Sequence, residues 1–114
     1  AARLTAALAG HDGIVTPCEM PGRRHVYHQY TVRVGEGPAA RDRLQASLRE
    51  RGIESAVFYP APIHRQPLYV RLGYGDVSLP VAERLAGEVL SLPVHPALSA
   101  DDIDAIASAV IGAL

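Results

Sequence analysis

The clearest alternation of apolar and polar side chains runs along residues 25–34, which read HVYHQYTVRV. A period of two residues indicates a β-strand with one buried face. The side chains that would share this face are Val26, His28, Tyr30, Val32 and Val34. Two further segments, residues 53–59 and 91–96, are also predicted to be extended. The prolines of the second segment favour a position at the edge of a sheet.

Other segments carry apolar side chains at the three- and four-residue spacing of helices. The four predicted helices cover residues 1–10, 39–52, 79–92 and 100–114. Ser99, with Asp102 three residues later, is predicted to cap the start of the last helix. In the second helix, Leu44 and Leu48 are expected to face inward and the arginines to face solvent.

These elements follow the order helix, strand, helix, strand, long loop, helix, short strand, helix. Residues 11–24 and 71–78 are expected to be loops, because glycine or proline interrupts them. Few strands with flanking helices predict an α+β two-layer sandwich, in which a small, mainly antiparallel three-stranded sheet has helices on one face. A chain of 114 residues is long enough for one domain with a modest core.

Composition argues against several classes of function. The net charge of −1 gives no electrostatic reason to expect a nucleic acid or an anionic membrane as partner, and the apolar runs are far shorter than a membrane span. Cys18 is the single cysteine, which excludes an intrachain disulfide and suggests a cytoplasmic protein. All eleven basic residues are arginine, so no side-chain amine can form a Schiff base in this chain.

No cluster of side chains predicts a catalytic, cofactor-binding or metal site. His25 and His28 fall on opposite faces of the predicted strand, so they cannot share a metal ion, and the other histidines lack the spacing of zinc ligands. His28 is interpreted as a core-facing, hydrogen-bonded histidine. Asp104 is expected to lie on a solvated helix face, and Cys18 has no evident base beside it.

Residues 58–69, which read FYPAPIHRQPLY, are the strongest candidate for a binding segment. Their three prolines fix φ and remove backbone donors, so the segment cannot pair fully in a sheet. A rigid loop here could present Tyr59, His64 and Arg65 to a ligand, and the last two can donate hydrogen bonds to an anion such as phosphate. A second interpretation stays open, in which a stiff crossing loop packs Tyr59 and Tyr69 against the core.

Several stretches, taken in order, resemble the carboxy-terminal part of the DegT/DnrJ/StrS family of pyridoxal-phosphate-dependent sugar aminotransferases. The most specific are YPAPIHRQP and AERLAGEVLSLPVHP. The resemblance implies that residues 1–10 end the helix between a large and a small domain, and that residues 11–114 form the small domain of a fold-type I enzyme. In that family the large domain carries the Schiff-base lysine, which agrees with the lack of lysine in this chain.

The same resemblance implies a function for the complete enzyme. It would transfer an amino group, usually from glutamate, to a nucleotide-linked keto-sugar, with pyridoxal phosphate as cofactor, and it would act as a homodimer. This chain would be inactive alone, would lack its partner large domain, and would contribute substrate contacts. The residues that match the family's loop at the substrate, or lie within it, include Tyr59, His64, Arg65 and Tyr69. Phe58 departs from the family, because many members have histidine there.

An alternative of another class remains. A free-standing α+β domain of this size could bind a small ligand or an interaction partner. If the chain is instead a small domain without its large domain, part of its interface is uncovered, and residues 1–10 are the segment expected to expose apolar surface.

Overall fold

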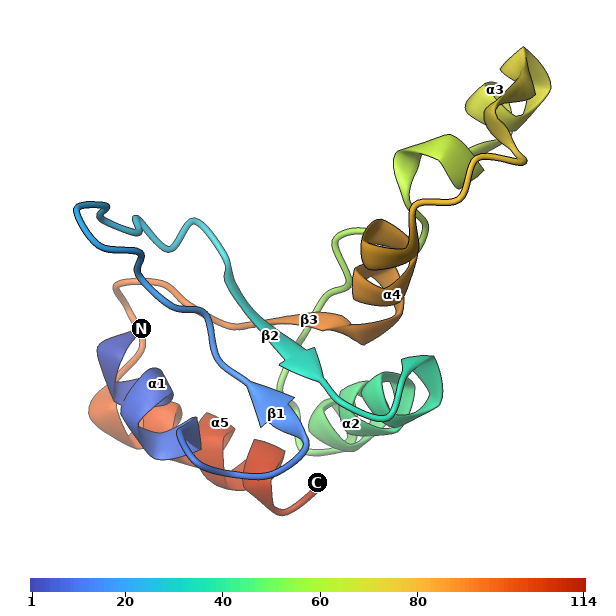
Figure 1. The fold of residues 1–114 in the computed structure, drawn as a ribbon. Coiled ribbons are helices and arrows are strands. Elements are labelled where there is room, and N and C mark those ends of the chain that lie inside the picture. Colours follow the sequence, from blue (N-terminus) through green and yellow to red (C-terminus); the bar gives the residue numbers. More distant parts are fainter.

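The computed structural model describes residues 1–114 (Figure 1). Its strands are β1 (Ile14–Val15), β2 (Tyr30–Val34) and β3 (Val89–Leu92). Its longer helices are α1 (Ala2–Leu8), α2 (Pro38–Glu50), α4 (Pro80–Glu88) and α5 (Ala100–Ile111). Three short helical turns lie between α2 and α4, namely η1 (Ile63–Arg65), α3 (Pro67–Tyr69) and η2 (Val70–Tyr74).

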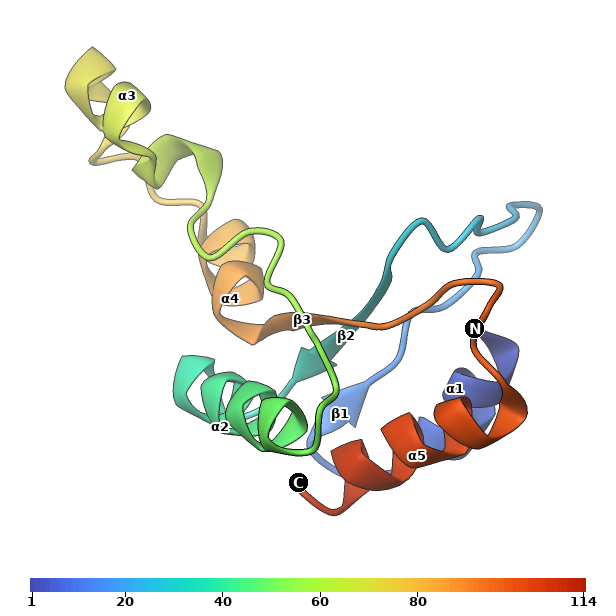
Figure 2. The ribbon, with the colours of Figure 1, turned by 180° about the vertical axis from the view of Figure 1, so that it is seen from behind.

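The three strands form one antiparallel sheet in the order β1-β2-β3. Tyr30 pairs with Leu92 and Arg33 with Val89, which sets the register of the central pair. Every second residue of β2 is buried, as its alternating sequence predicts. The helices α1, α2 and α5 lie on the same side of the sheet (Figures 1 and 2). The predicted α+β sandwich is therefore confirmed.

The hydrophobic core lies between this sheet and its helices. Its largest fully buried side chains are Tyr30, Leu4, Leu8, Leu44, Leu48, Leu90, Val32 and Val110. Leu4 and Leu8 belong to α1 and are each 1% exposed, so the expectation that residues 1–10 expose apolar surface is wrong. The helix instead packs along α5, where Arg3 also pairs with Asp104 at 2.5 Å. Asp104 is thus an ion-pair partner as well as a half-exposed side chain.

Residues 58–79 leave this body as a projecting arm, which contains η1, α3 and η2 (Figures 1 and 2). We call residues 58–79 the arm and the rest of the chain the body. The large apolar side chains that the arm exposes are Phe58, Tyr59, Ile63, Leu68, Tyr69, Val70, Leu72, Tyr74, Val77 and Leu79. The exposed apolar surface of the molecule is therefore concentrated on the arm. The loop expected at residues 71–78 in fact begins with the helical turn η2.

The strand expected at residues 25–34 is shorter in the structure and begins at Tyr30. Tyr27 has a φ of 50°, a left-handed conformation that an extended strand cannot contain. The ring of His25 stabilises this bend, because its Nδ1 accepts a hydrogen bond from the Tyr27 N–H at 2.8 Å. His28 is exposed as a result, and its interpretation as a core-facing, hydrogen-bonded histidine is wrong.

The other two extended segments also differ from expectation. Residues 53–59 make only one bridge to the sheet, in which Ala56 and Ser91 exchange backbone hydrogen bonds of 2.8 and 3.1 Å. The third strand starts at Val89, inside the helix predicted for residues 79–92. All four residues of β3 are buried or half-buried, so β3 does not alternate between apolar and polar side chains. Its sequence therefore looks like a continuation of the preceding helix. Ile14 and Val15 form β1 within a predicted loop.

Arg41 shows why the helix gives way to a strand at this point. It is buried, contrary to the expectation that the arginines of α2 face solvent. Its Nη1 donates to the carbonyl oxygens of Ala86 and Val89, both at 3.3 Å. These carbonyls lie where α4 ends, and an arginine that binds them satisfies groups that the helix leaves unpaired.

The last helix follows its sequence closely. Ser99 Oγ accepts a hydrogen bond from the Asp102 N–H at 3.1 Å, and the Ser99 N–H donates to the Asp102 carboxylate at 2.8 Å. This reciprocal pair is the predicted capping box. None of the helices combines the length and the apolar composition that a bilayer crossing would require.

Candidate functional site

All four residues that the sequence selects lie on the arm. Tyr59 is 71% exposed and Tyr69 is 38% exposed, whereas His64 is buried with 6% of its surface accessible. Arg65 is exposed and follows His64 in η1. The Tyr69 ring meets the edge of Tyr74, with 6.2 Å between their centroids. The tyrosines therefore do not pack into the core of the body.

The arm and α4 together line an open cavity of about 670 Å³. Tyr59, His64 and Tyr69 line it, so the structure brings three of the four selected residues to one place. Arg65 does not line it. Most of the other lining side chains are apolar and come from residues 58–63 and from α4. A cavity with apolar walls and a few hydroxyl or imidazole groups is typical of a small-molecule site.

Glu83, on the first turns of α4, connects these elements. Its Oε1 lies 2.9 Å from His64 Nε2 and 3.3 Å from Arg65 Nη2. The Leu79 N–H, just before the helix, donates to the same oxygen at 3.0 Å. Three donors from the two ends of the arm therefore converge on one carboxylate oxygen.

The electrostatics of this group follow from its donors. The Leu79 N–H has the largest effect and the His64 hydrogen bond the next, and together with Arg65 they lower the pKa of Glu83 to about 2. Arg65 also donates through Nη1 to the Gly75 carbonyl oxygen. The guanidinium thus donates to a carboxylate on α4 and to a carbonyl of the arm. His64 Nδ1, in contrast, is buried without a hydrogen-bond partner.

Glu83 was not among the residues that the sequence selected. One local signal could have indicated it. Glu83 is an acidic residue in the first turn of a helix that begins at Pro80, where a carboxylate can accept a hydrogen bond from an unpaired backbone N–H. Its partner His64 is 19 residues away along the chain. No local pattern links the two residues, and only the folded arm brings them together.

Comparison with known proteins assigns this arrangement to a family. The pattern of the DegT/DnrJ/EryC1/StrS aminotransferase family matches residues 1–111. The chain belongs to the DegT/DnrJ/EryC1/StrS aminotransferase family. It is 52% identical over 87 residues to a pleiotropic regulatory protein of Geobacillus stearothermophilus, covering 76% of this chain and 22% of that protein.

Two further relatives carry names that describe a reaction or an intermediate. The chain is 41% identical to a dTDP-3-amino-3,4,6-trideoxy-alpha-D-glucose transaminase of Streptomyces venezuelae, over 86% of this chain and 25% of that protein. It resembles the crystal structure of S. venezuelae DesV in complex with a ketimine intermediate, with a TM-score of 0.88 and 37% identity over 97% of this chain and 29% of that one. The chain thus spans roughly a quarter of each relative.

Family membership raises the question of whether these residues could hold pyridoxal phosphate. The chain contains no lysine, so no side chain here can form an imine with the cofactor's aldehyde. Covalent attachment of the cofactor through a lysine would therefore involve residues other than these. No three His, Cys, Asp or Glu side chains are grouped so that they could hold a metal ion.

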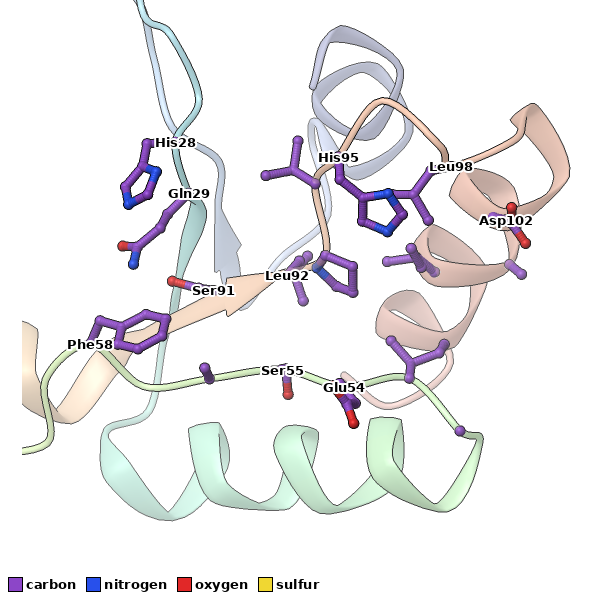
Figure 3. A pocket seen from close by; sticks show the side chains of 17 residues that line it. His28, Gln29, Glu54, Ser55, Phe58, Ser91, Leu92, His95, Leu98 and Asp102 are labelled. Carbon is purple, nitrogen blue, oxygen red and sulfur yellow. The ribbon is translucent and has the colours of Figure 1, made fainter.

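A second cavity, of about 580 Å³, lies on the body. Figure 3 shows His28 and Gln29 beside β2 on one side of it, and His95, Leu98 and Asp102 toward α5 on the other. Phe58 is the one residue that lines both cavities. Asp102 is already occupied by the cap of α5. This cavity contains none of the four residues that the aminotransferase resemblance selects.

Proposed function

We propose that this chain is the carboxy-terminal small domain of a pyridoxal-phosphate-dependent nucleotide-sugar aminotransferase. The complete enzyme would convert a keto-sugar to an amino-sugar, with glutamate as the amino donor. Support comes from the family match over residues 1–111 and from relatives that are named as transaminases of dTDP- and UDP-sugars. The small domain would supply substrate contacts, and the large domain would supply the lysine and the cofactor.

The observation that carries this proposal is the cavity that the arm lines together with α4. Tyr59 and Tyr69 provide rings and hydroxyl groups at its wall, and these groups suit the flat base and the polar sugar of a nucleotide-sugar. His64 lines the same cavity and would contact the substrate when it enters. Arg65 follows His64 in η1 but does not line the cavity, so we propose it as a contact only for substrate groups that extend beyond the cavity, through the guanidinium donors that Glu83 and Gly75 leave free.

The arm exposes many large apolar side chains, which supports the proposal that other parts of the complete enzyme cover the arm. We assign the cover to the large domain of the same chain and to the second subunit of a homodimer. In this arrangement residues 1–10 end the helix between the two domains, and residues 11–114 form the small domain. We place the enzyme in the cytoplasm, where the exposed thiol of Cys18 would stay reduced.

Replacement of His64 tests the role of the arm in the complete enzyme. We expect His64→Ala to raise KM for the nucleotide-sugar roughly tenfold, which corresponds to about 1.4 kcal/mol of lost binding. The half-reaction with glutamate should change by less than about twofold. Single-turnover kinetics of the two half-reactions measure these effects separately. His11→Ala, which removes an exposed histidine outside both cavities, is the matched control.

The assignment of His64 is wrong if His64→Ala slows only the half-reaction with glutamate. It is also wrong if His11→Ala produces the same rise in KM, because that rise would then reflect a general loss of structure.

A free-standing regulatory or interaction module is the second candidate. One observation favours a regulatory role, the 52% identity to a protein named as a pleiotropic regulator, although this chain covers only 22% of that protein. The coding sequence upstream of Ala1 separates the two candidates. A preceding lysine-bearing domain supports the aminotransferase, and a start codon at or near Ala1 supports the module.

A further inference from the structure

We propose that Glu83 is the positioning residue of the arm, and that its carboxylate holds His64 with the ring proton on Nε2 while joining both ends of the arm to α4. The link to substrate binding rests on the proposed function, but the geometry of Glu83 and His64 does not. Glu83 does not line the arm cavity, so it would act on a bound substrate through His64.

The position of the His64 ring proton follows from its contact with Glu83. Nε2 faces Glu83 Oε1 at 2.9 Å, and a carboxylate can only accept a hydrogen bond, so the proton must be on Nε2. Nδ1 is buried without a partner. If the neutral ring carried its proton on Nδ1, a buried donor would be unsatisfied and the Nε2 lone pair would face a negative charge. Glu83 therefore determines which nitrogen is protonated.

Glu83 also connects distant parts of the arm. His64 and Arg65 lie in η1, near the start of the arm, and Leu79 is its last residue. All three donate to Glu83, while Arg65 also binds the carbonyl of Gly75 on the returning segment. The arm has no buried apolar residue of its own, and His64 is its one buried side chain. These hydrogen bonds therefore connect the start of the arm, its returning segment and the first turn of α4.

A simpler role for Glu83 is to cap α4 by accepting the Leu79 N–H. The two roles differ in what they predict for His64. If Glu83 is only a cap, removal of its charge leaves the His64 imidazole unaffected. If Glu83 is a positioning residue, the same removal changes the environment of the proton on His64 Nε2, and magnetic resonance detects this change directly.

The test uses this chain with ¹⁵N-labelled histidine at neutral pH. In the wild type, we expect His64 to be protonated on Nε2 and unprotonated on Nδ1, with the Nε2-bound proton resolved downfield. Glu83→Gln keeps the side-chain size and an acceptor for the Leu79 N–H, and it should shift this proton upfield. Glu83→Ala should lose the resonance through exchange with water. Glu88→Gln, on the same helix but paired with Arg33, is the matched control and should change nothing at His64.

The proposal is overturned if wild-type His64 carries its proton on Nδ1, or if Glu83→Gln leaves the Nε2-bound proton unchanged. The wild-type spectrum gives the first answer even if Glu83→Ala fails to fold, and the conservative Glu83→Gln variant gives the second.

A double-mutant cycle in the complete enzyme relates this coupling to substrate binding. Glu83→Gln should raise KM for the nucleotide-sugar, and Glu83→Gln with His64→Ala should be no worse than His64→Ala by more than about twofold. Additive effects would show that Glu83 does not act through His64. If the spectra agree and neither variant alters KM, the proposed function fails while the coupling of Glu83 to His64 stands.

Discussion

The body and the arm are stabilised in different ways. In the body, fourteen buried side chains form one apolar cluster between the sheet and its helices. In the arm, the one buried side chain is a histidine, and the large apolar side chains face outward. The body therefore has the contacts of a self-sufficient core, whereas the arm depends on a few hydrogen bonds to Glu83 and presents apolar surface to other molecules.

Truncation of one core leucine should have the largest effect on stability and should show the difference between the body and the arm. Leu90 is fully buried in β3, and Leu90→Ala should lower the free energy of unfolding by about 2–5 kcal/mol through lost burial and a residual cavity. Leu72→Ala, at an arm position that is 62% exposed, should change it by less than about 0.5 kcal/mol. Urea denaturation measures both. Equal losses in the two variants would mean that the arm is part of the cooperative core.

Acid should weaken the arm locally. Glu83 has its pKa lowered from an ordinary value of 4.5 to about 2, so its contribution is complete above pH 4.5 and is lost as pH falls toward 2. We expect the Leu79 amide resonance to titrate with a midpoint near pH 2, because its N–H donates to this carboxylate. A midpoint near 4.5 would show that the carboxylate is not held by its donors. Glu83→Gln should abolish the titration.

The smallest effect is expected at the ion pair between α1 and α5. Arg3 and Asp104 lie 2.5 Å apart, but about half of each side chain is exposed to solvent. Water and salt weaken such pairs, so Asp104→Asn should produce only a slight loss of stability that disappears at high salt. Thermal unfolding at low and high ionic strength measures it. A large loss that persists in salt would make this pair a main support of α1.

The parts of the body that the sequence predicts well are those with local signals. Alternation locates β2, and Ser99 with Asp102 locates the start of α5. The strand β3 was predicted at the edge of the sheet but at residues 91–96, and its start at Val89 was missed because Val89 continues the four-residue spacing of α4. Only the distant Arg41, which binds carbonyls at this junction, shows where the helix ends. Contacts between residues far apart in the sequence set the boundary between α4 and β3, and the pattern within one segment does not reveal such contacts.

The arm shows the same limit. Its prolines correctly indicate that residues 58–69 do not pair in a sheet, and three of the four residues selected there line one cavity. The hydrogen bonds around Glu83 could not be inferred, because His64, Arg65 and Leu79 meet only after the chain turns back on itself. The role of these residues toward a nucleotide-sugar stays a prediction.

Hydrogen–deuterium exchange of the complete enzyme, with and without its nucleotide-sugar, would show where the substrate binds. We predict that the substrate slows exchange in the arm, at residues 58–79, and leaves β2 and α5 unchanged. Slower exchange around the second cavity, at residues 53–56 and 93–98, with no change in the arm would contradict it.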